Sequence, residues 1–240
     1  MKTTRPATQP ISRRAMLVRS AVALTGTFFA PRILIGALRP ESSIGYVVGE
    51  PIVEDIGTKI LADGGNAFDA LVATALAGAI TQPHQTGVGG YAAHAMLAYD
   101  GGARLAALDA NTSAPGAMRE DIFKPGRDGK VPDRKNEYGW LASGVPGLIG
   151  GLHLVVQKFG SRPFSAALQP SIKLLRDGFP IGANVATAIN AAAPQLGKDP
   201  GSRKIYFPRG RPLAAGATCK NPELAELLEA LAKANSVEPF

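Results

Sequence analysis

The stretch ILADGGNAFDA at residues 60–70 ends one helix and begins the next, and it decides the first part of the fold. Gly64 and Gly65 stop the first helix, because glycine takes up the left-handed conformation of a helix C-terminus without steric cost. Asn66 is a favourable N-cap for the second helix. That helix, predicted over residues 67–81, is apolar almost all round, which indicates burial on more than one side. We therefore expect a core helix that lies against a sheet.

Strands are predicted before and after this helix pair. Residues 44–48 are apolar and bounded by glycine, which is typical of a short strand. Pro51 then opens the first helix, as proline does at a first helical position. Residues 91–99 form another predicted strand, and the turn signal at residues 100–102 leads into a return strand over 104–108.

The rest of the chain is predicted to be an exposed excursion followed by helices. Residues 116–140 are polar and rich in glycine, proline and charge, which favours exposure. No internal repeat and no second boundary interrupts residues 39–240, so they are predicted to form one domain. The predicted helices run from Pro146 to Gly160, over residues 164–177 and 183–193, and onward from the N-cap Asn221.

The positive charge of the chain is concentrated in its first 38 residues. The whole sequence carries a net charge of +7, and residues 1–38 contain Lys and Arg but no Asp or Glu. Removing that segment leaves a charge of about +1 on residues 39–240. A nucleic-acid-binding protein needs a basic face on its folded domain, so nucleic acid is not predicted as a partner.

The segment 1–38 is predicted to be a twin-arginine export signal. Arg13 and Arg14 follow a polar residue and precede apolar ones, and a modest apolar stretch covers residues 21–30. That stretch is too short to span a bilayer, which takes about 20 residues. The pattern predicts a periplasmic or secreted protein. No clear small-x-small cleavage motif follows Ala30, so retention as a membrane tether stays open.

Local motifs name neither a nucleophile nor a metal site. The glycine-rich residues 86–91 stand between a helix and a strand, the reverse of the order in a dinucleotide-binding fingerprint. His84, His94 and His153 lack the close spacing of a zinc site. No Gly-x-Ser-x-Gly elbow is present, although a Ser-His-Asp triad stays possible. Cys219, the only cysteine, has no nearby histidine and is predicted to be structural.

A series of short motifs follows in order along residues 44–240. They are GYVV at 45–48, IG at 56–57, ILxxGGNAxDA at 60–70, GVGG at 87–90, AP at 114–115, SGVPG at 143–147, KFG at 158–160, QPSIxL at 169–174, DGF at 177–179 and NPxLA at 221–225. Taken in this order, they resemble the N-terminal, large-subunit portion of gamma-glutamyltransferases. The resemblance implies a mixed α/β (α+β) fold, part of the four-layer αββα sandwich of N-terminal-nucleophile hydrolases.

The resemblance also implies an activity, namely transfer or hydrolysis of a gamma-glutamyl or related acyl amide such as glutathione, without a metal or organic cofactor. In the family a precursor cleaves itself, and the new N-terminal Thr of the small subunit is the nucleophile. No Thr of this chain matches that position. The resemblance therefore assigns no catalytic residue here and implies a small-subunit-like partner chain. A truncated, non-catalytic remnant or binding protein of the same fold is the alternative.

Asn111 is the one candidate substrate-binding residue. The family pattern Asp-x-Arg-Glu-x-Ala-Pro uses its Arg to pair with the α-carboxylate of the acyl donor. Residues 109–115 read DANTSAP, so Asn111 stands at the Arg position. Asparagine donates hydrogen bonds but supplies no charge and no bidentate fork. The change implies weaker carboxylate recognition by roughly 1.5–3 kcal/mol and leaves the acyl donor open.

Overall fold

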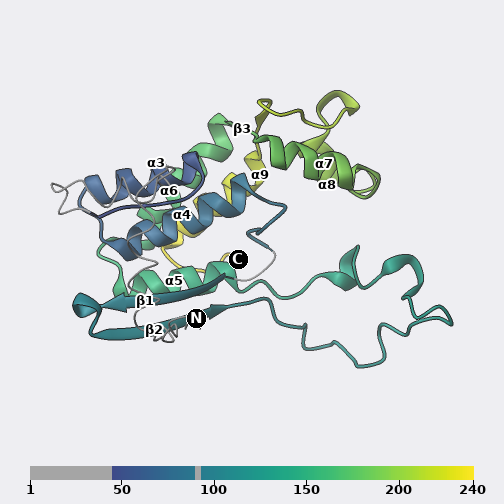
Figure 1. Ribbon diagram of the computed structural model, residues 1–240, viewed down its shortest axis with the longest axis horizontal. Helices are drawn as coiled ribbons and strands as arrows, with labels where there is room; N and C mark the ends of the chain where they lie inside the picture. The colour runs from purple at the N-terminus through teal and green to yellow at the C-terminus, as the bar shows by residue number, and fades with distance from the viewer. Residues whose placement is uncertain (1–44, 90–92) are drawn as a thin grey trace, which may run out of the picture. The chain divides into compact units, whose positions relative to one another are not determined.

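Two helices, α3 (Pro51–Ala62) and α4 (Ala67–Thr81), open the described part of the computed structural model, which comprises residues 45–89 and 93–240 (Figure 1). Asn66 caps α4 as predicted, since its side-chain oxygen accepts the backbone N–H of Asp69 at 3.0 Å. The Asp69 carboxylate in turn accepts the backbone N–H of Asn66 at 2.9 Å. This reciprocal capping box gives partners to amides that the helix itself leaves unpaired.

Asp69 also joins the start of α4 to a distant loop. Its side chain is buried and accepts the backbone N–H groups of Ser161 at 3.0 Å and Arg162 at 3.3 Å. Asn66 adds a bond from its side-chain nitrogen to the backbone oxygen of Phe159 at 2.7 Å. Several donors around one buried carboxylate offset its loss of hydration.

The apolar core surrounds α4, which is buried on several sides as predicted, but its main contacts are with other helices and not with a sheet. The core forms where α4 meets α5 (Leu148–Phe159) and α6 (Phe164–Asp177), and where α6 meets α9 (Pro222–Ala234). Fully buried side chains from these helices include Leu76, Leu152, Leu168 and Leu228.

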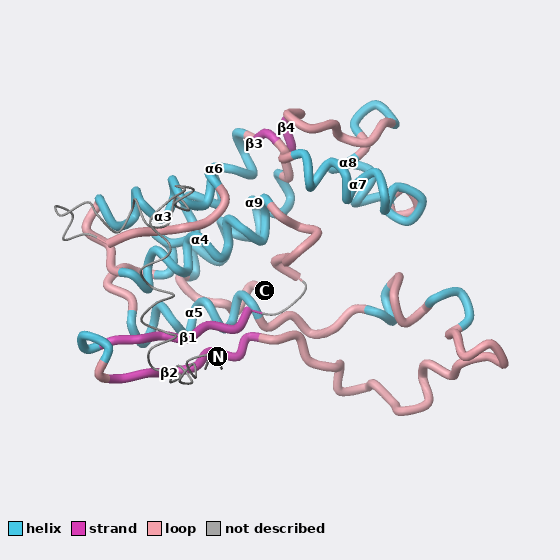
Figure 2. Tube along the Cα trace, in the orientation of Figure 1, coloured by secondary structure: helices cyan, strands magenta, loops and turns pink. Residues whose placement is uncertain are grey.

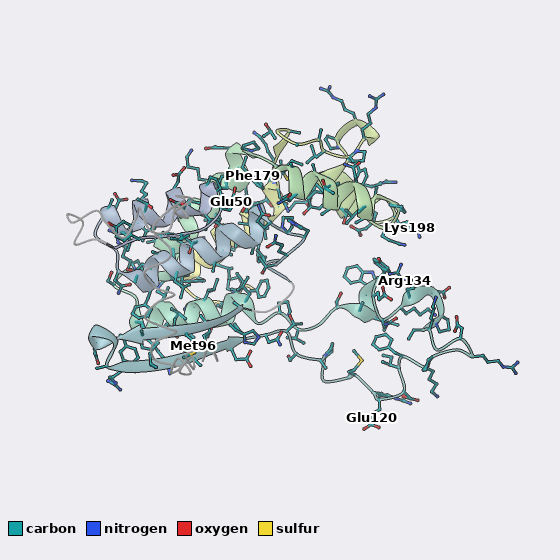
Figure 3. The ribbon with its side chains drawn as sticks, in the orientation of Figure 1. Glu50, Met96, Glu120, Arg134, Phe179 and Lys198 are labelled. Atoms are coloured by element: carbon teal, nitrogen blue, oxygen red, sulfur yellow. The ribbon has the colours of Figure 1, made fainter. Side chains whose placement is uncertain are left out.

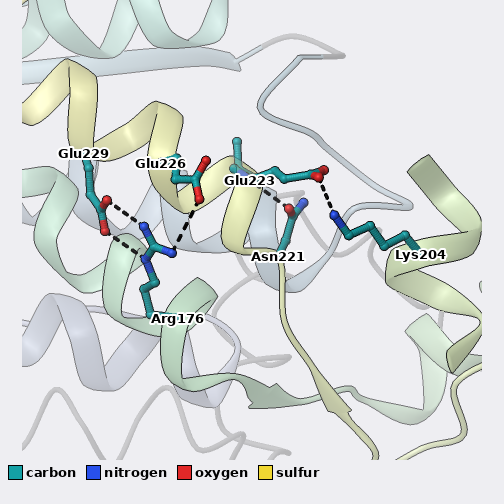
Figure 4. Close-up of polar contacts among 7 residues, drawn as sticks. Arg176, Lys204, Asn221, Glu223, Glu226 and Glu229 are labelled. Atoms are coloured by element: carbon teal, nitrogen blue, oxygen red, sulfur yellow. Dashed lines mark hydrogen bonds and ion pairs between the residues drawn. The ribbon is translucent and has the colours of Figure 1, made fainter. Parts of the chain in front are cut away.

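A surface ion-pair network spans the contact between α6 and α9 (Figure 4). Arg176 of α6 donates to both carboxylate oxygens of Glu229 at 2.9 and 2.7 Å, and it lies 3.9 Å from Glu226. Asn221 caps α9 by accepting the backbone N–H of Leu224 at 3.1 Å. This network fixes helices rather than forming a site, because each charge already has a partner.

The predicted hairpin is formed by β1 (Ala93–Tyr99) and β2 (Arg104–Ala110), joined by the 3-10 turn η1 (Asp100–Gly102). The strands are antiparallel, with Tyr99 opposite Arg104 and His94 opposite Asp109. One face packs against α5 through buried residues that include Leu97 and Leu108 (Figure 1). None of the described elements covers the other face, here called the open face, and Met96 on it is 71% exposed (Figure 3).

The excursion between β2 and α5 is exposed and mostly loop, as predicted (Figure 2). It contains two short 3-10 turns, η2 (Pro132–Arg134) and η3 (Trp140–Ala142). Its ends meet in an isolated antiparallel bridge, where Ser113 and Val145 exchange backbone hydrogen bonds of 3.2 and 2.8 Å. The loop therefore leaves and rejoins the fold at one place, directly after β2.

Beyond α6 the structure adds elements that sequence reasoning missed. A small sheet pairs β3 (Phe179–Pro180) with β4 (Thr218–Cys219). The predicted helix at 183–193 is α7 (Ala183–Leu196), and a further helix, α8 (Pro200–Tyr206), precedes the 3-10 turn η4 (Pro208–Gly210). The N-cap of α8 is Asp199, which accepts the backbone N–H of Ser202 at 2.6 Å.

The strand predicted at residues 44–48 is wrong for its described part, residues 45–48, which form no strand. A strand needs a neighbouring backbone, and among the described residues none pairs with this segment. Its apolar character serves packing instead. Val47 contacts α3 so closely that a Cβ at Gly57 would lie 2.7 Å from a Val47 methyl group.

The predicted export signal, with Arg13 and Arg14, lies outside the described residues. Within the described ranges, no helix combines the length and the apolar character needed to cross a membrane.

Candidate functional site

Asn111 lies directly after the last residue of β2 and, like Asp109, is exposed. Its backbone N–H donates to Oδ1 of Asp109 at 3.0 Å, so the Asp109 side chain closes a turn at the end of the strand. The side-chain oxygen of Asn111 accepts the backbone N–H of Thr112 at 2.8 Å. With its oxygen engaged, the exposed Asn111 side chain offers its NH₂ group, a neutral hydrogen-bond donor, to a partner.

The backbone around Asn111 is held by glycines at the start of α5. A Cβ at Gly147 would lie 2.3 Å from the carbonyl oxygen of Asn111, and one at Gly144 would lie 2.0 Å from a Thr112 methyl group. Both distances are far below a van der Waals contact, so a side chain at either position would displace the strand exit. The SGVPG motif therefore positions residue 111, a role that its sequence alone did not suggest.

His94 is the neighbour that sequence reasoning missed. It lies opposite Asp109 in the hairpin, with its Nδ1 atom 3.5 Å from Oδ1 of that residue. Alternate residues of a strand share a face, so His94 and Asp109 lie on the open side of the hairpin, and Asn111 follows at the end of β2. The sequence could have revealed the pair of His94 and Asp109, because counting outward along both strands from the turn at residues 100–102 places these two residues opposite each other.

The other two histidines belong to different surroundings. The ring of His84 lies 3.5 Å from the side chain of Gln85, and the ring of His153 packs against Phe164 with centroids 4.9 Å apart. Across residues 45–89 and 93–240, no group of three or more His, Cys, Asp and Glu side chains could hold a metal ion. The donor set of the described chain therefore offers no metal centre.

Cys219 is buried, and that burial raises the pKa of its thiol to about 11. A thiol with a raised pKa stays protonated near neutral pH and is a poor nucleophile. This environment agrees with the structural role predicted for it.

The cavities of the described chain that carry apolar linings lie away from Asn111. One of about 560 Å³ lies between α3 and α6, with Ile60 and Leu174 in its lining. Another, of about 360 Å³, is lined by Val88 of the glycine-rich loop together with Cys219 and Leu224. The loop therefore contributes to an apolar wall, whereas a phosphate cradle would need exposed backbone N–H groups at a helix start.

Comparison with known proteins decides the family. The family model described as gamma-glutamyltranspeptidase matches residues 54–240. The chain belongs to the gamma-glutamyltranspeptidase family. It is 34% identical over 194 residues to glutathione hydrolase 3 of Arabidopsis thaliana, covering 80% of this chain and 29% of that protein. It is 33% identical over 192 residues to the acylase ACY 1 proenzyme of Pseudomonas sp. strain V22, covering 78% and 34%.

A solved member of the family has the same fold. The gamma-glutamyltranspeptidase of Helicobacter pylori superposes with a TM-score of 0.75 and 29% identity, covering 82% of this chain and 56% of that one. The predicted fold class is confirmed, and the chain is the large-subunit part of an αββα sandwich, in which helices cover one face of a sheet. The chain spans about 30% of the length of the curated relatives that it matches.

Proposed function

We propose that this chain forms part of an enzyme that transfers or hydrolyses acyl amides, with the acyl donor held at Asn111 and the nucleophilic Thr supplied by a small-subunit-like partner. The observation that carries the proposal is the fixed position of residue 111, set by β2 on one side and by Gly144 and Gly147 on the other. Relatives named glutathione hydrolase and acylase support the reaction class.

The donor specificity follows from the side chain at that position. An arginine would offer a charged, bidentate contact to an α-carboxylate, whereas Asn111 offers a neutral NH₂ group. The loss amounts to about ten- to a hundredfold in affinity for a carboxylate-bearing donor. We therefore place a gamma-glutamyl donor such as glutathione within a wider set of acyl amides.

The open face of the hairpin supports the proposed partner. Met96 and Leu105 are 71% and 66% exposed there, and an apolar sheet face of this kind is normally covered by a second sheet. In an αββα sandwich two sheets pack face to face. We assign the strands that would cover this face to the small-subunit-like chain.

Export is part of the proposal as well. The Arg13-Arg14 pair supports translocation to the periplasm or beyond by the twin-arginine route. Replacing both arginines with lysine should retain the protein in the cytoplasm, as measured by fractionation. Normal export of that variant would contradict the assignment.

A series of four anilides tests the acyl-transfer function. The γ-glutamyl, glutaryl, 4-aminobutyryl and butyryl anilides share one acyl backbone and carry, respectively, both charged groups, the carboxylate alone, the ammonium alone, and neither. The enzyme tested is the protein with both halves of the family fold. We expect Asn111→Arg to raise kcat/KM about ten- to a hundredfold for the two carboxylate donors and to leave the other two nearly unchanged.

Asn111→Lys is the matched control, because it adds the charge without the fork and should give a smaller gain. Equal effects on all four anilides would show that residue 111 does not contact the donor. Absence of turnover with every anilide, in a protein that carries both halves, would instead favour the non-catalytic alternative.

A further inference from the structure

Positive charge is concentrated on α8 and on the turns that flank it. Residues 198–211 carry a net charge of +4, whereas residues 39–240 as a whole carry about +1, so the remainder of that domain is negative. The positive side chains of the segment are all exposed, and they are Lys198, Arg203, Lys204, Arg209 and Arg211. The charge of the fold is therefore gathered in one place.

These cations lie around one hollow of about 570 Å³. It is lined by Gly197, Pro200, Arg203, Lys204, Phe207 and Gly210. Lys198 is the chain neighbour of the first lining residue, and Arg209 and Arg211 are the two chain neighbours of the last. The cations and the hollow consequently form one surface, here called the basic surface.

Hydrogen bonds and an ion pair hold the basic surface in place. The N–H of Leu213 donates to the backbone oxygen of Tyr206 at 2.9 Å, which closes the loop at residues 207–212, and Leu213 itself is buried. Lys204 pairs with Glu223 of α9 (Figure 4). This pair links α8 to α9 and matches the charge of Lys204.

The other four cations have no carboxylate partner within residues 45–89 and 93–240. The one acidic residue of the segment, Asp199, caps α8 and accepts the backbone N–H of Ser202 at 2.6 Å. Cations that are gathered without partners repel one another and attract anions. The basic surface therefore favours an anionic partner.

Arg209 stands where glycine would cost less. Its backbone has φ 60° and ψ 26°, a left-handed conformation that is uncommon for residues other than glycine. Glycine would adopt it without steric cost. The strained position therefore places a positive charge at the tip of a turn, which supports a role for the side chain itself.

We propose that the basic surface docks on a membrane that exposes anionic phospholipids, with lipid phosphates contacting its four unpaired cations. Such a membrane has a negative surface potential that attracts nearby Lys and Arg side chains. Nucleic acid attracts clustered cations too, but export through Arg13 and Arg14, as proposed above, favours an encounter with a membrane. The basic surface shares no residue with the Asn111 site, so this inference is independent of the acyl-transfer function.

Cosedimentation with vesicles tests the docking, using the protein with both halves of the family fold. The vesicles contain phosphatidylcholine mixed with phosphatidylglycerol, or phosphatidylcholine alone. Each Lys or Arg near an anionic surface contributes about fivefold to binding. The double variant Arg209→Gly, Arg211→Gln should therefore bind the mixed vesicles about 30-fold more weakly at low salt. Added salt should weaken binding of the unmodified protein.

The matched control is Arg127→Gln, Lys130→Gln, which removes the same charge from the exposed excursion and should leave binding nearly unchanged. Both double variants keep residues 1–38, so any binding through that segment cancels in the comparison. Arg209→Lys, Arg211→Lys should retain most of the binding, because a surface potential acts on charge and needs no guanidinium fork.

A second pair of substitutions, Lys198→Gln, Arg203→Gln, leaves the loop at residues 207–212 unchanged and should weaken binding by a similar factor. Equal binding of the basic-surface variants and the control, or equal binding to both kinds of vesicle, overturns the proposal. Fluorescence anisotropy with a labelled DNA duplex addresses the other polyanion. Tighter binding to DNA than to the mixed vesicles, lost in the same variants, would assign the surface to nucleic acid and overturn the membrane role.

Discussion

Gly150 and Gly151 are adjacent in α5, and alanine at the two positions should have opposite effects on stability. Alanine at a helix-interior glycine stabilises by about 1 kcal/mol through helix propensity alone. A Cβ at Gly150 meets no heavy atom within 4 Å, so Gly150→Ala should realise that gain. A Cβ at Gly151 would lie 2.3 Å from Cβ of Ala110 and 3.5 Å from a Leu108 methyl group, both in β2.

The comparison isolates the contact between α5 and the hairpin. The propensity gain is common to both variants and cancels in their difference. What remains is the cost of pushing β2 away from the helix, and overpacking of this kind costs typically about 1–3 kcal/mol. Gly151→Ala should therefore be less stable than Gly150→Ala by about that amount.

Urea unfolding followed by far-ultraviolet circular dichroism measures the difference, provided that both variants are made in the same background. The unfolding slope should be the same for both, which would show that the change lies in the folded state. If Gly151→Ala matches or exceeds Gly150→Ala in stability, α5 does not contact β2 as closely as the structure places it. Gly144 and Gly147, in the same region, would then not hold Asn111 in place either.

Three further predictions concern the core, the open sheet face and the buried thiol. Asp69→Ala should destabilise the fold by about 3 kcal/mol or more in the same unfolding assay, because several buried donors lose their acceptor. The control Asp63→Ala breaks only the exposed ion pair with Lys59 and should cost under about 1 kcal/mol. The 240-residue polypeptide by itself should associate through the open hairpin face, and a Met96→Lys, Leu105→Lys double variant should shift it toward monomer in sedimentation velocity; unchanged association would exclude this face. Cys219 should resist iodoacetamide at pH 8 in the folded protein and react rapidly in urea. Because burial raises the pKa of its thiol from 9.0 to about 11, the thiol ionises first in the unfolded chain. The free energy of unfolding should therefore fall as the pH rises from about 9 toward 11.

Local chemistry predicted the helix starts well, because a cap acts within one turn. Asn66 was identified as an N-cap from its own side chain and the apolar residues that follow. The same logic would have found α8, since Asp199 precedes Pro200 as a cap and a first-turn proline. What local chemistry did not predict is the second role of Asp69, whose donors at Ser161 and Arg162 lie more than 90 residues away in the chain.

The strand predicted at residues 44–48 was wrong because strand formation depends on a partner backbone that composition does not reveal. Residues 45–48 have the composition of a strand, but a strand forms only where a second backbone lies alongside. The hairpin was predicted correctly because its partner is adjacent in sequence and the turn brings the two together. Composition alone therefore identifies a segment that could be a strand and leaves its partner open.

The candidate site, too, was predicted from the sequence only in part. The position of Asn111 came from the DANTSAP stretch and its resemblance to a family pattern, which no periodicity could have supplied. The close approach of Gly144 and Gly147 depends on how α5 packs against the end of β2 and was not readable from the motif. His94 stands within the strand predicted at residues 91–99, but only the register between the two strands places it opposite Asp109.

The way residue 111 is held explains how its side chain could change without cost to the fold. Its backbone is fixed by contacts that involve no part of its own side chain beyond Cα, namely Gly147 against its carbonyl oxygen and Asp109 on its N–H. Its side chain is exposed and, within residues 45–89 and 93–240, bonds only to the neighbouring amide of Thr112. Arginine or asparagine at this position should thus give the same fold and nearly the same stability. In the proposed function it is the chemistry at the donor site that changes, from a cation that attracts a carboxylate to a neutral hydrogen-bond donor near the Asp109 carboxylate.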